Sequence, residues 1–325
     1  MPFTPPSGAE NIASLCREHG MQVSLADLEL IVAGASGRVV MRVCVGGEPC
    51  GIIGVYWTAS RADNNSYIPA TEGLSAHGVR VPRLLRYRDE GGGCGTCLVE
   101  DLGRADLLSL KDASRDDKLR AYQSAMVEMH RLHSLHPDWP LQPAFDADMY
   151  RWEQGYFAEH FLGTHLGQES GIFVDLPQAH AVAEWLATLP RVPIHRDFQS
   201  QNIMLCHDNV ALIDYQGMRY GLAEYDLASL VYDPYMALDS REVKSLLGMY
   251  TQLTGTKLDV SVFCACALQR LMQALGAYAN IGYNRQRQWY LDMIPQGVKA
   301  LRAVAAETPS HSPAYSLAQW LLDHV

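Results

Sequence analysis

One segment of the chain combines polar side chains at a spacing suited to metal-dependent chemistry. His195, Arg196 and Asp197 stand in a row, Asn202 follows five residues after Asp197, and Asp214 follows further along the chain. Carboxylate and amide oxygens are the ligands that Mg²⁺ prefers in proteins, where it completes its shell from water and substrate phosphates. The segment therefore predicts a magnesium site formed by Asn202 and Asp214, with the Asp197 carboxylate within reach of it.

Two short strands must position these residues. The apolar runs Ile203–Leu205 and Val210–Ile213 bound a turn at residues 207–209, a pattern that predicts a β-hairpin. Asn202 stands at the start of the first strand and Asp214 at the end of the second. Because the two ends of an antiparallel pair are neighbours, we expect the amide oxygen and the carboxylate to converge at the open end of the hairpin.

The chain changes character near residue 103. Before this point, short β-branched runs separated by glycine turns predict an antiparallel sheet. The expected strands are 38–43, 51–57, 84–88 and 96–100, with one helix at about 64–77. After Gly103, apolar residues recur with a period close to 3.6 and predict helices. The expected helices are 116–135, 149–166, 178–189, 226–232 and 261–279. We therefore expect an α+β fold with a small antiparallel-sheet N-terminal lobe, residues 1–102, and a larger, mainly helical C-terminal lobe, residues 103–325.

Composition restricts the partners and the compartment. The 325 residues include 26 Lys and Arg against 36 Asp and Glu, which gives a formal net charge of −10. An acidic chain lacks the broad basic face that phosphate backbones need, so we expect no nucleic-acid partner. No run approaches the roughly 18 uncharged apolar residues of a membrane helix. The first residues also lack the basic and apolar regions of a signal peptide. These features favour a cytoplasmic protein with no membrane partner.

The polar segment resembles a known catalytic loop. His195, Arg196, Asp197 and Asn202 have the H-R-D-x4-N spacing of protein kinases, and Asp214 occupies the position of the downstream metal-binding aspartate. Tyr215-Gln216 replaces the Phe-Gly of protein kinases, however, and no Ala-Pro-Glu follows. The chain is instead similar to the aminoglycoside-phosphotransferase-like small-molecule kinases, from roughly residue 34 to residue 300. Within them it is most similar to the kinases that phosphorylate N-acetylmuramate and N-acetylglucosamine at the anomeric position.

This resemblance implies a bilobal protein-kinase-like fold, and ATP and Mg²⁺ as cofactors. It implies that Asp197 accepts or orients the proton of the attacking hydroxyl, and that Asn202 and Asp214 hold Mg²⁺ at the ATP phosphates. Asp226, at the start of the next helix, would hydrogen-bond the backbone of the catalytic loop, and His195 and Arg196 would give this loop further structural support. Asp197 alone could also be a turn residue, and Asp226 alone a helix cap.

The N-terminal lobe would bind the nucleotide, with ATP between the two lobes and the acceptor in the helical lobe. The resemblance implies that Glu100–Leu102 form a hinge whose backbone meets the adenine edge. There is no lysine before Lys111, so the strand lysine that ordinary kinases use for the ATP phosphates is missing. The loop before the first strand offers glycines for close backbone approach and polar donors. Its candidate nucleotide-binding residues are Gly34, Ser36, Gly37 and Arg38, with Arg42 as a further donor. A plain β-turn is the alternative for this loop.

The acceptor site is predicted from neighbours of the catalytic residues. Gln199, Gln216 and Arg219 flank the catalytic and metal positions, so their side chains can reach an acceptor. Glu153 lies on a helix rich in aromatic residues, a mixture that suits the apolar and hydroxyl surfaces of a sugar. The alternative for that helix is a core helix.

The sequence therefore predicts a phosphotransferase with an alcohol group as acceptor. Its small-molecule substrate is expected to be an N-acetylated amino sugar of cell-wall recycling. One alternative is a kinase of an aminoglycoside, choline or another small alcohol. A second alternative, from another class, is a non-catalytic nucleotide-binding pseudokinase, which would have no use for Asp197.

Overall fold

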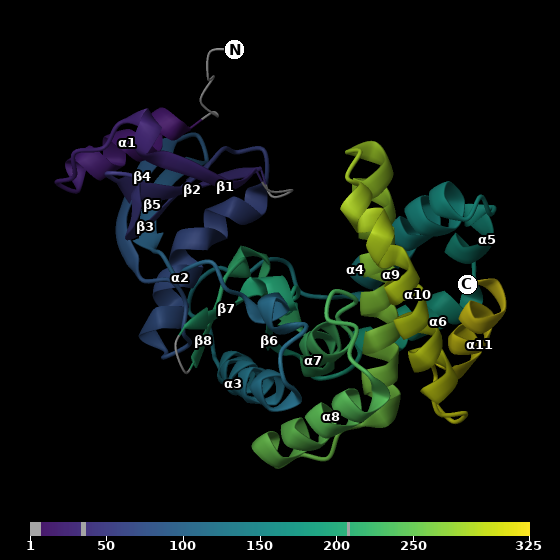
Figure 1. The fold of residues 1–325 in the computed structure, drawn as a ribbon. Helices are drawn as coiled ribbons and strands as arrows, with labels where there is room; N and C mark the ends of the chain where they lie inside the picture. Colours follow the sequence, from purple (N-terminus) through teal and green to yellow (C-terminus); the bar gives the residue numbers. More distant parts are fainter. Residues whose placement is uncertain (1–7, 34–36, 207–208) are drawn as a thin grey trace. The chain divides into compact units, whose positions relative to one another are not determined.

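The computed structural model describes residues 8–33, 37–206 and 209–325 (Figure 1). The chain divides into two compact units. The first contains residues 1–106, 136–142 and 203–217, and the second contains residues 107–135, 143–202 and 218–325. Each unit is therefore built from three chain segments, whereas the two lobes expected from the sequence, residues 1–102 and 103–325, were continuous. Gly34, Ser36 and the turn residues His207 and Asp208 lie outside the described residues.

The first unit is built on an antiparallel sheet of five strands in the order β1-β2-β3-β5-β4. The strands are β1 (Leu28–Ala33), β2 (Arg38–Val45), β3 (Glu48–Trp57), β4 (Leu84–Gly91) and β5 (Cys94–Glu100). Helix α1 (Ala9–Glu18) precedes the sheet, and α2 (Tyr67–Ala76) lies between β3 and β4 in the chain. The expected antiparallel sheet is confirmed. The strand β1 and the helix α1 were not predicted.

Helix α1 packs against this sheet, and apolar side chains of the helix and of the strands together form a core (Figure 1). Ile12 and Leu15 of α1 are fully buried together with Val43 of β2 and Leu98 of β5. The helix approaches β3 at Gly54, where a Cβ atom would lie 2.2 Å from Cγ2 of Ile12. Glycine is therefore needed at position 54 for close packing, since an added methyl group would overlap the Ile12 side chain.

The predicted β-hairpin is present and belongs to the first unit. Strands β7 (Ile203–Cys206) and β8 (Asn209–Leu212) pair antiparallel, with Ile203 opposite Leu212. Two backbone hydrogen bonds join it to the rest of the unit. The Leu205 amide donates to the Ala105 carbonyl at 2.9 Å, and the Leu212 amide donates to the Arg80 carbonyl at 2.8 Å.

The second unit is mainly helical. Its helices are α3 (Arg115–His133), α4 (Ala147–Phe157), α5 (Ser170–Val174), α6 (Pro177–Ala187), α7 (Ala223–Val231), α8 (Ser240–Thr254), α9 (Val260–Asn284), α10 (Gln288–Glu307) and α11 (Tyr315–His324). Two short strands, β6 (Val192–Ile194) and β9 (Arg219–Gly221), pair antiparallel. The sequence predicted α3, α4, α6, α7 and α9, with α4 continuing as a π-helix over Ala158–His165. It did not predict α5, α8, α10 and α11.

Helix α9 is the central helix of this unit. It packs against α4, α7 and α10 and contributes a long series of buried side chains. By length and composition α9 could cross a membrane, but 78% of its most apolar stretch is buried inside the folded protein. This burial is typical of a core helix, and it places the few polar residues of α9 against neighbouring elements.

The close contact between α1 and β3 gives a stability prediction. Replacing Gly54 by Ala should lower the free energy of unfolding by about 1–3 kcal/mol, because the new methyl group overlaps Ile12. Gly248→Ala is the matched control: Gly248 lies within α8, with nothing within 4 Å of an added Cβ. This control should stabilise by about 0.5–1 kcal/mol. Urea unfolding of both variants measures the effects, and equal stability of the two variants would contradict the packing argument.

Candidate active site

A buried carboxylate holds the loop that carries Asp197. Asp226 of α7 is fully buried and accepts the backbone N–H of His195 at 2.7 Å and that of Arg196 at 2.8 Å. It also lies 3.0 Å from Nε2 of His133 on α3. Arg196 has a φ of 79°, in the left-handed region that side chains other than glycine seldom adopt. Such strain persists where the surroundings fix the backbone, and Asp226 provides this constraint directly before Asp197.

Asp197 itself is a half-buried carboxylate surrounded by cations. Its side chain is 35% exposed, so a ligand can reach it, and Oδ1 lies 3.7 Å from a guanidinium nitrogen of Arg270. Burial raises its pKa, but Arg196, Arg270, His195 and Arg219 together lower the pKa below its ordinary value. Asp197 is therefore ionised at neutral pH. Its backbone carbonyl accepts from Nδ2 of Asn202 at 2.9 Å, which brings two of the predicted site residues together.

Arg270 of α9 links Asp197 to three polar side chains, which belong to Ser229, Gln273 and Gln199. The Arg270 side chain is buried, its Nε donates to Oγ of Ser229 at 3.0 Å, and a terminal nitrogen donates to Oε1 of Gln199 at 3.2 Å. A second terminal nitrogen donates to Gln273. The guanidinium is thus fixed in position by α7, α9 and the loop that carries Asp197. It connects Gln199, one of the predicted acceptor contacts, to the Asp197 carboxylate.

Glu153 has a different environment from the one expected. It was predicted to contact a sugar, but its side chain has no exposed surface. Its carboxylate accepts from the Tyr225 hydroxyl at 3.1 Å and from Nε2 of Gln269 at 3.2 Å, and it lies 3.5 Å from a guanidinium nitrogen of Arg196. Burial raises the pKa of Glu153, while Arg196 and these donors lower it. Glu153 therefore supports Arg196 from inside the unit and has no surface with which to bind a substrate.

Arg219 lies on β9 with its guanidinium 5.5 Å from the centre of the Phe145 ring. It is 6% exposed, and burial, followed by the nearby Arg196 charge, lowers its pKa to about 10. Arg219 still carries a full charge at neutral pH. Together with Arg196 and Arg270, it is one of three arginines whose charges act on the Asp197 carboxylate.

Asp214 lies in the first unit, two residues beyond β8. Its φ is 66°, so it is the second strained residue among the predicted site residues. Its carboxylate forms an ion pair with Arg38 of β2 and accepts from Nε2 of Gln216 at 3.0 Å. Oε1 of Gln216 is buried and has no hydrogen-bond partner among residues 8–33, 37–206 and 209–325. The site thus offers oxygen ligands to a cation, and the arginine is itself a stand-in cation at Asp214.

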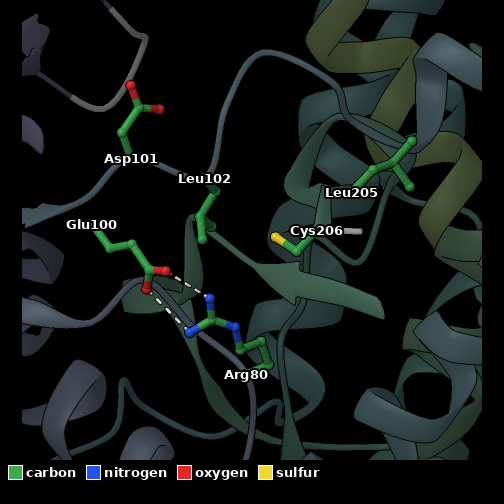
Figure 2. A pocket seen from close by; sticks show the side chains of 6 residues that line it. All are labelled: Arg80, Glu100, Asp101, Leu102, Leu205 and Cys206. Carbon is green, nitrogen blue, oxygen red and sulfur yellow. Dashed lines mark hydrogen bonds and ion pairs between the residues drawn. The ribbon is translucent and has the colours of Figure 1, made fainter. Parts of the chain in front are cut away.

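The residues expected to form the nucleotide hinge line a cavity in the first unit (Figure 2). The cavity has a volume of about 240 Å³ and is lined by Arg80, Glu100, Asp101, Leu102, Leu205 and Cys206. Arg80 holds the Glu100 carboxylate through two hydrogen bonds of 2.8 and 3.1 Å. The backbone amides of Glu100 and Asp101 donate to the carbonyls of Arg83 and Gly51. Within the described part of the chain, the structure shows no hydrogen bond to the amide or the carbonyl of Leu102.

The loop before β2 is described only from Gly37 onward. Gly37 has a φ of 68°, which favours glycine, and it leads directly into Arg38. Arg42, offered above as a further phosphate donor, has another partner: its guanidinium binds the Asp101 carboxylate at 2.5 and 3.0 Å and the Gly103 carbonyl at 2.8 Å. Arg42 therefore stabilises the segment after β5.

Two supporting residues were missed by the sequence analysis. Asp233 is buried and accepts the backbone amides of Ser200 at 2.8 Å and Tyr235 at 2.9 Å, so it fixes the second half of the catalytic loop. His133 of α3, the second of these residues, contacts Asp226. A single aspartate before a proline and a histidine in a helical series carry no signal of a long-range contact, so neither could be found from the sequence.

Comparison with known proteins identifies the family of the chain. The model of the phosphotransferase enzyme family matches residues 66–259. The N-acetylmuramate/N-acetylglucosamine kinase of Pseudomonas aeruginosa is 26% identical over 255 residues, covering 73% of this chain and 72% of the relative. The kinase of the same name from Neisseria meningitidis serogroup B is 25% identical over 257 residues, covering 74% of this chain and 75% of the relative.

Solved structures share the fold. A choline/ethanolamine kinase family protein from Mesorhizobium loti has a TM-score of 0.64 at 14% identity, covering 96% of this chain and 98% of that one. An aminoglycoside phosphotransferase from Streptomyces rimosus, solved with ADP and streptomycin, has a TM-score of 0.58 at 18% identity, covering 82% of this chain and 99% of that one. The predicted bilobal, protein-kinase-like α+β fold is confirmed.

The chain belongs to the phosphotransferase enzyme family. It is an enzyme that transfers phosphoryl groups, which confirms the class predicted from the sequence.

The contact between Arg270 and Asp197 gives a pH prediction. Arg270→Gln removes one of the cations that lower the pKa of Asp197, so this pKa should rise and the acid limb of kcat/KM should move to higher pH. Loss of the fixed contact should also lower kcat by about ten- to hundredfold. Coupled ADP release across pH measures both effects.

The control for this variant is Arg285→Gln, which removes an exposed arginine at the end of the same helix. Its pH profile should match that of the unmodified enzyme. An unshifted acid limb in an Arg270→Gln protein that melts at the normal temperature would show that Arg270 does not act on Asp197.

Proposed function

We propose that this protein is an ATP- and Mg²⁺-dependent kinase that phosphorylates the anomeric hydroxyl of an N-acetylated amino sugar, in the recycling of cell-wall sugars. The observation that carries the proposal is the half-exposed, ionised Asp197 on a loop whose backbone is fixed by Asp226. The location in the cytoplasm stays a prediction from the sequence.

Asp197 acts on the hydroxyl of the acceptor in this proposal. Its carboxylate accepts the proton of the attacking hydroxyl or orients it, and a lowered pKa suits this task. In a loose phosphoryl-transfer transition state the nucleophile loses its proton late, so positioning matters more than basicity. Arg270, held by Ser229 and Gln199, keeps the carboxylate in place. His195 and Arg196 contribute through their backbone amides.

Asp214 and Asn202 fit a magnesium ion by their chemistry. Both offer oxygen ligands, and Asp214 already attracts a cation, since the Arg38 guanidinium lies against it. Bound there, Mg²⁺ would neutralise charge on the ATP phosphates. Gln216, which donates to Asp214, orients this carboxylate. The convergence of Asp197, Asn202 and Asp214 at one point stays a prediction.

The adenine base would bind in the cavity next to the hinge. Leu102 and Leu205 provide apolar side chains for the base (Figure 2). The backbone amide and carbonyl of Leu102 would meet the edge of the base. The Glu100 side chain is held by Arg80 and does not compete for the base. The proposed contacts with the ATP phosphates come from the loop before β2, at Gly34, Ser36, Gly37 and Arg38.

The charges around Asp197 favour a neutral or anionic acceptor. Arg196, Arg219 and Arg270 all lower the pKa of this carboxylate, so a cationic acceptor would approach like charges. Aminoglycosides and choline are cations, whereas N-acetylglucosamine is neutral and N-acetylmuramate carries a carboxylate. The relatives named for these two sugars support the same choice. Gln199 and Arg219 are the proposed acceptor contacts.

Replacing the proposed catalytic carboxylate should separate binding from turnover. Asp197→Asn should lower kcat by a factor of about 100 or more, because the amide cannot accept the hydroxyl proton. The nucleotide dissociation constant should change by less than about threefold, since the proposed hinge lies elsewhere. Turnover is measured by coupled ADP release and nucleotide binding by calorimetry. Near-normal turnover in the variant would remove Asp197 from the mechanism.

An acceptor screen tests the substrate. ATP consumption with Mg²⁺ should be fast with N-acetylmuramate and N-acetylglucosamine and at least about tenfold slower with kanamycin and choline, because of the cationic surroundings. The 1-deoxy analogue of N-acetylglucosamine is the matched control and should not be phosphorylated, as it lacks the anomeric hydroxyl. Preference for a cationic acceptor would overturn the charge argument, and no ATP use with any acceptor would favour the pseudokinase.

A further inference from the structure

The first unit must bind phosphates without the usual lysine. In protein kinases a lysine on the third strand pairs with a glutamate of the following helix and contacts the ATP phosphates. Here the corresponding strand β3 carries no Lys or Arg, and the acidic residue of α2, Glu72, is exposed. Both halves of the usual ion pair are therefore missing from these elements.

Arg38 occupies the position that a phosphate-binding cation needs. It is the first residue of β2, is only 8% exposed, and forms an ion pair with Asp214, whose side chain is 38% exposed. The charge of the proposed magnesium ligand is thus compensated by an arginine of the same unit. Asp214 is partly exposed, so a metal ion from solution can reach its carboxylate and compete with Arg38 for it.

Helix α2 supports Arg38 through an aromatic ring. The guanidinium carbon lies 5.3 Å from the centre of the Tyr67 ring, a cation–π contact. Tyr67 stacks on Tyr215, with ring centres 5.5 Å apart and planes 3° apart. The Tyr215 hydroxyl lies 2.7 Å from Oγ1 of Thr71, one turn further along α2. The ring of Tyr67 therefore connects the cation on β2, the helix and the residue next to Asp214.

We propose that Arg38 replaces the missing lysine, and that it has two alternative partners. Without nucleotide, Arg38 pairs with Asp214. When Mg²⁺ and nucleotide bind, Arg38 leaves Asp214 and contacts the phosphates, while its guanidinium stays on the Tyr67 ring. The proposal rests on the proposed function, because it requires a metal at Asp214 and a nucleotide in the first unit.

The exchange keeps charge balanced in both states. In the free protein the guanidinium compensates the Asp214 carboxylate, so neither charge is left unpaired in a partly buried place. In the loaded protein the metal compensates the carboxylate, and the released guanidinium compensates phosphate oxygens. Tyr67 takes the place of the helix glutamate. Because a ring carries no net charge, it supports the cation without competing for it as a carboxylate would.

Opposite changes in two affinities test this exchange. Arg38→Ala should bind Mn²⁺ about two- to fivefold more tightly than the unmodified protein when no nucleotide is present, since the competing cation is gone. The same variant should bind ADP with Mg²⁺ about tenfold or more weakly, because a charged hydrogen-bond donor to phosphate is lost. Electron paramagnetic resonance of free Mn²⁺ and calorimetry with ADP measure these affinities without any catalytic turnover.

Three variants complete the measurement. Arg104→Ala removes an arginine of the same unit that pairs with the exposed Glu29, and it should leave both affinities unchanged. Tyr67→Leu should weaken ADP binding, whereas Tyr67→Phe, which keeps the ring, should not. Asp214→Asn defines the metal site and should abolish the tight Mn²⁺ binding of the Arg38→Ala protein.

The outcomes separate this proposal from the proposed function. Tighter Mn²⁺ binding together with weaker ADP binding in Arg38→Ala supports the exchange. Unchanged or weaker Mn²⁺ binding in a folded Arg38→Ala protein overturns it, as does unchanged ADP affinity, while the kinase assignment stands. Mn²⁺ binding that is insensitive to Asp214→Asn would overturn both, because the metal would then lie elsewhere.

Discussion

Two consecutive backbone amides, those of His195 and Arg196, donate to one fully buried carboxylate, Asp226. Hydrogen bonds to a charged group contribute about 1.5–3 kcal/mol each, which is enough to hold a single arginine in the left-handed region. This constraint sets the backbone immediately before Asp197. Two further contacts hold the same loop. Asp233 accepts the backbone amide of Ser200, and Arg270 contacts the Asp197 carboxylate, whose backbone position is already restricted.

Arginine is the second recurring feature of the site. Arg196, Arg219 and Arg270 surround Asp197 in one unit, and Arg38 lies against Asp214 in the other. The chain thus places arginines at its proposed catalytic and metal-binding carboxylates although its formal net charge is −10. Arginine suits these places because it stays charged when buried, as the pKa of about 10 for Arg219 illustrates. A buried lysine in the same position would lose its proton more readily. Arginine is therefore the more suitable cation for each of these buried positions.

The sequence predicted the parts of this protein whose signals are local. The hairpin was predicted because its apolar runs and its turn are adjacent in the chain. The candidate catalytic segment was singled out because its residue types have a fixed spacing. The contacts that give the residues their roles are not local: Asp226 reaches back 31 residues to His195, and Arg270 reaches back 71 residues to Gln199. Long-range contacts also explain why the prediction for Glu153 differs from the structure. Its polar character in an aromatic helix suggested a surface for sugar, while in the structure Tyr225 and Gln269 bury it completely.

The proposed catalytic residue and the proposed metal ligands are divided between the two units. The boundary between the units falls between Asn202 and Ile203, so Asp197 and Asn202 belong to the second unit and Asp214 to the first. Arg38, Tyr67 and the hinge cavity share the unit of Asp214, and Arg270 and Gln199 share the unit of Asp197. Nucleotide and metal affinity should therefore respond to residues of the first unit, and the reactivity of the acceptor hydroxyl to residues of the second. The chain enters the first unit at Ile203, directly after the loop that carries Asp197, and returns to the second unit after Gly217, so the hairpin that precedes Asp214 is joined to the second unit at both of its ends.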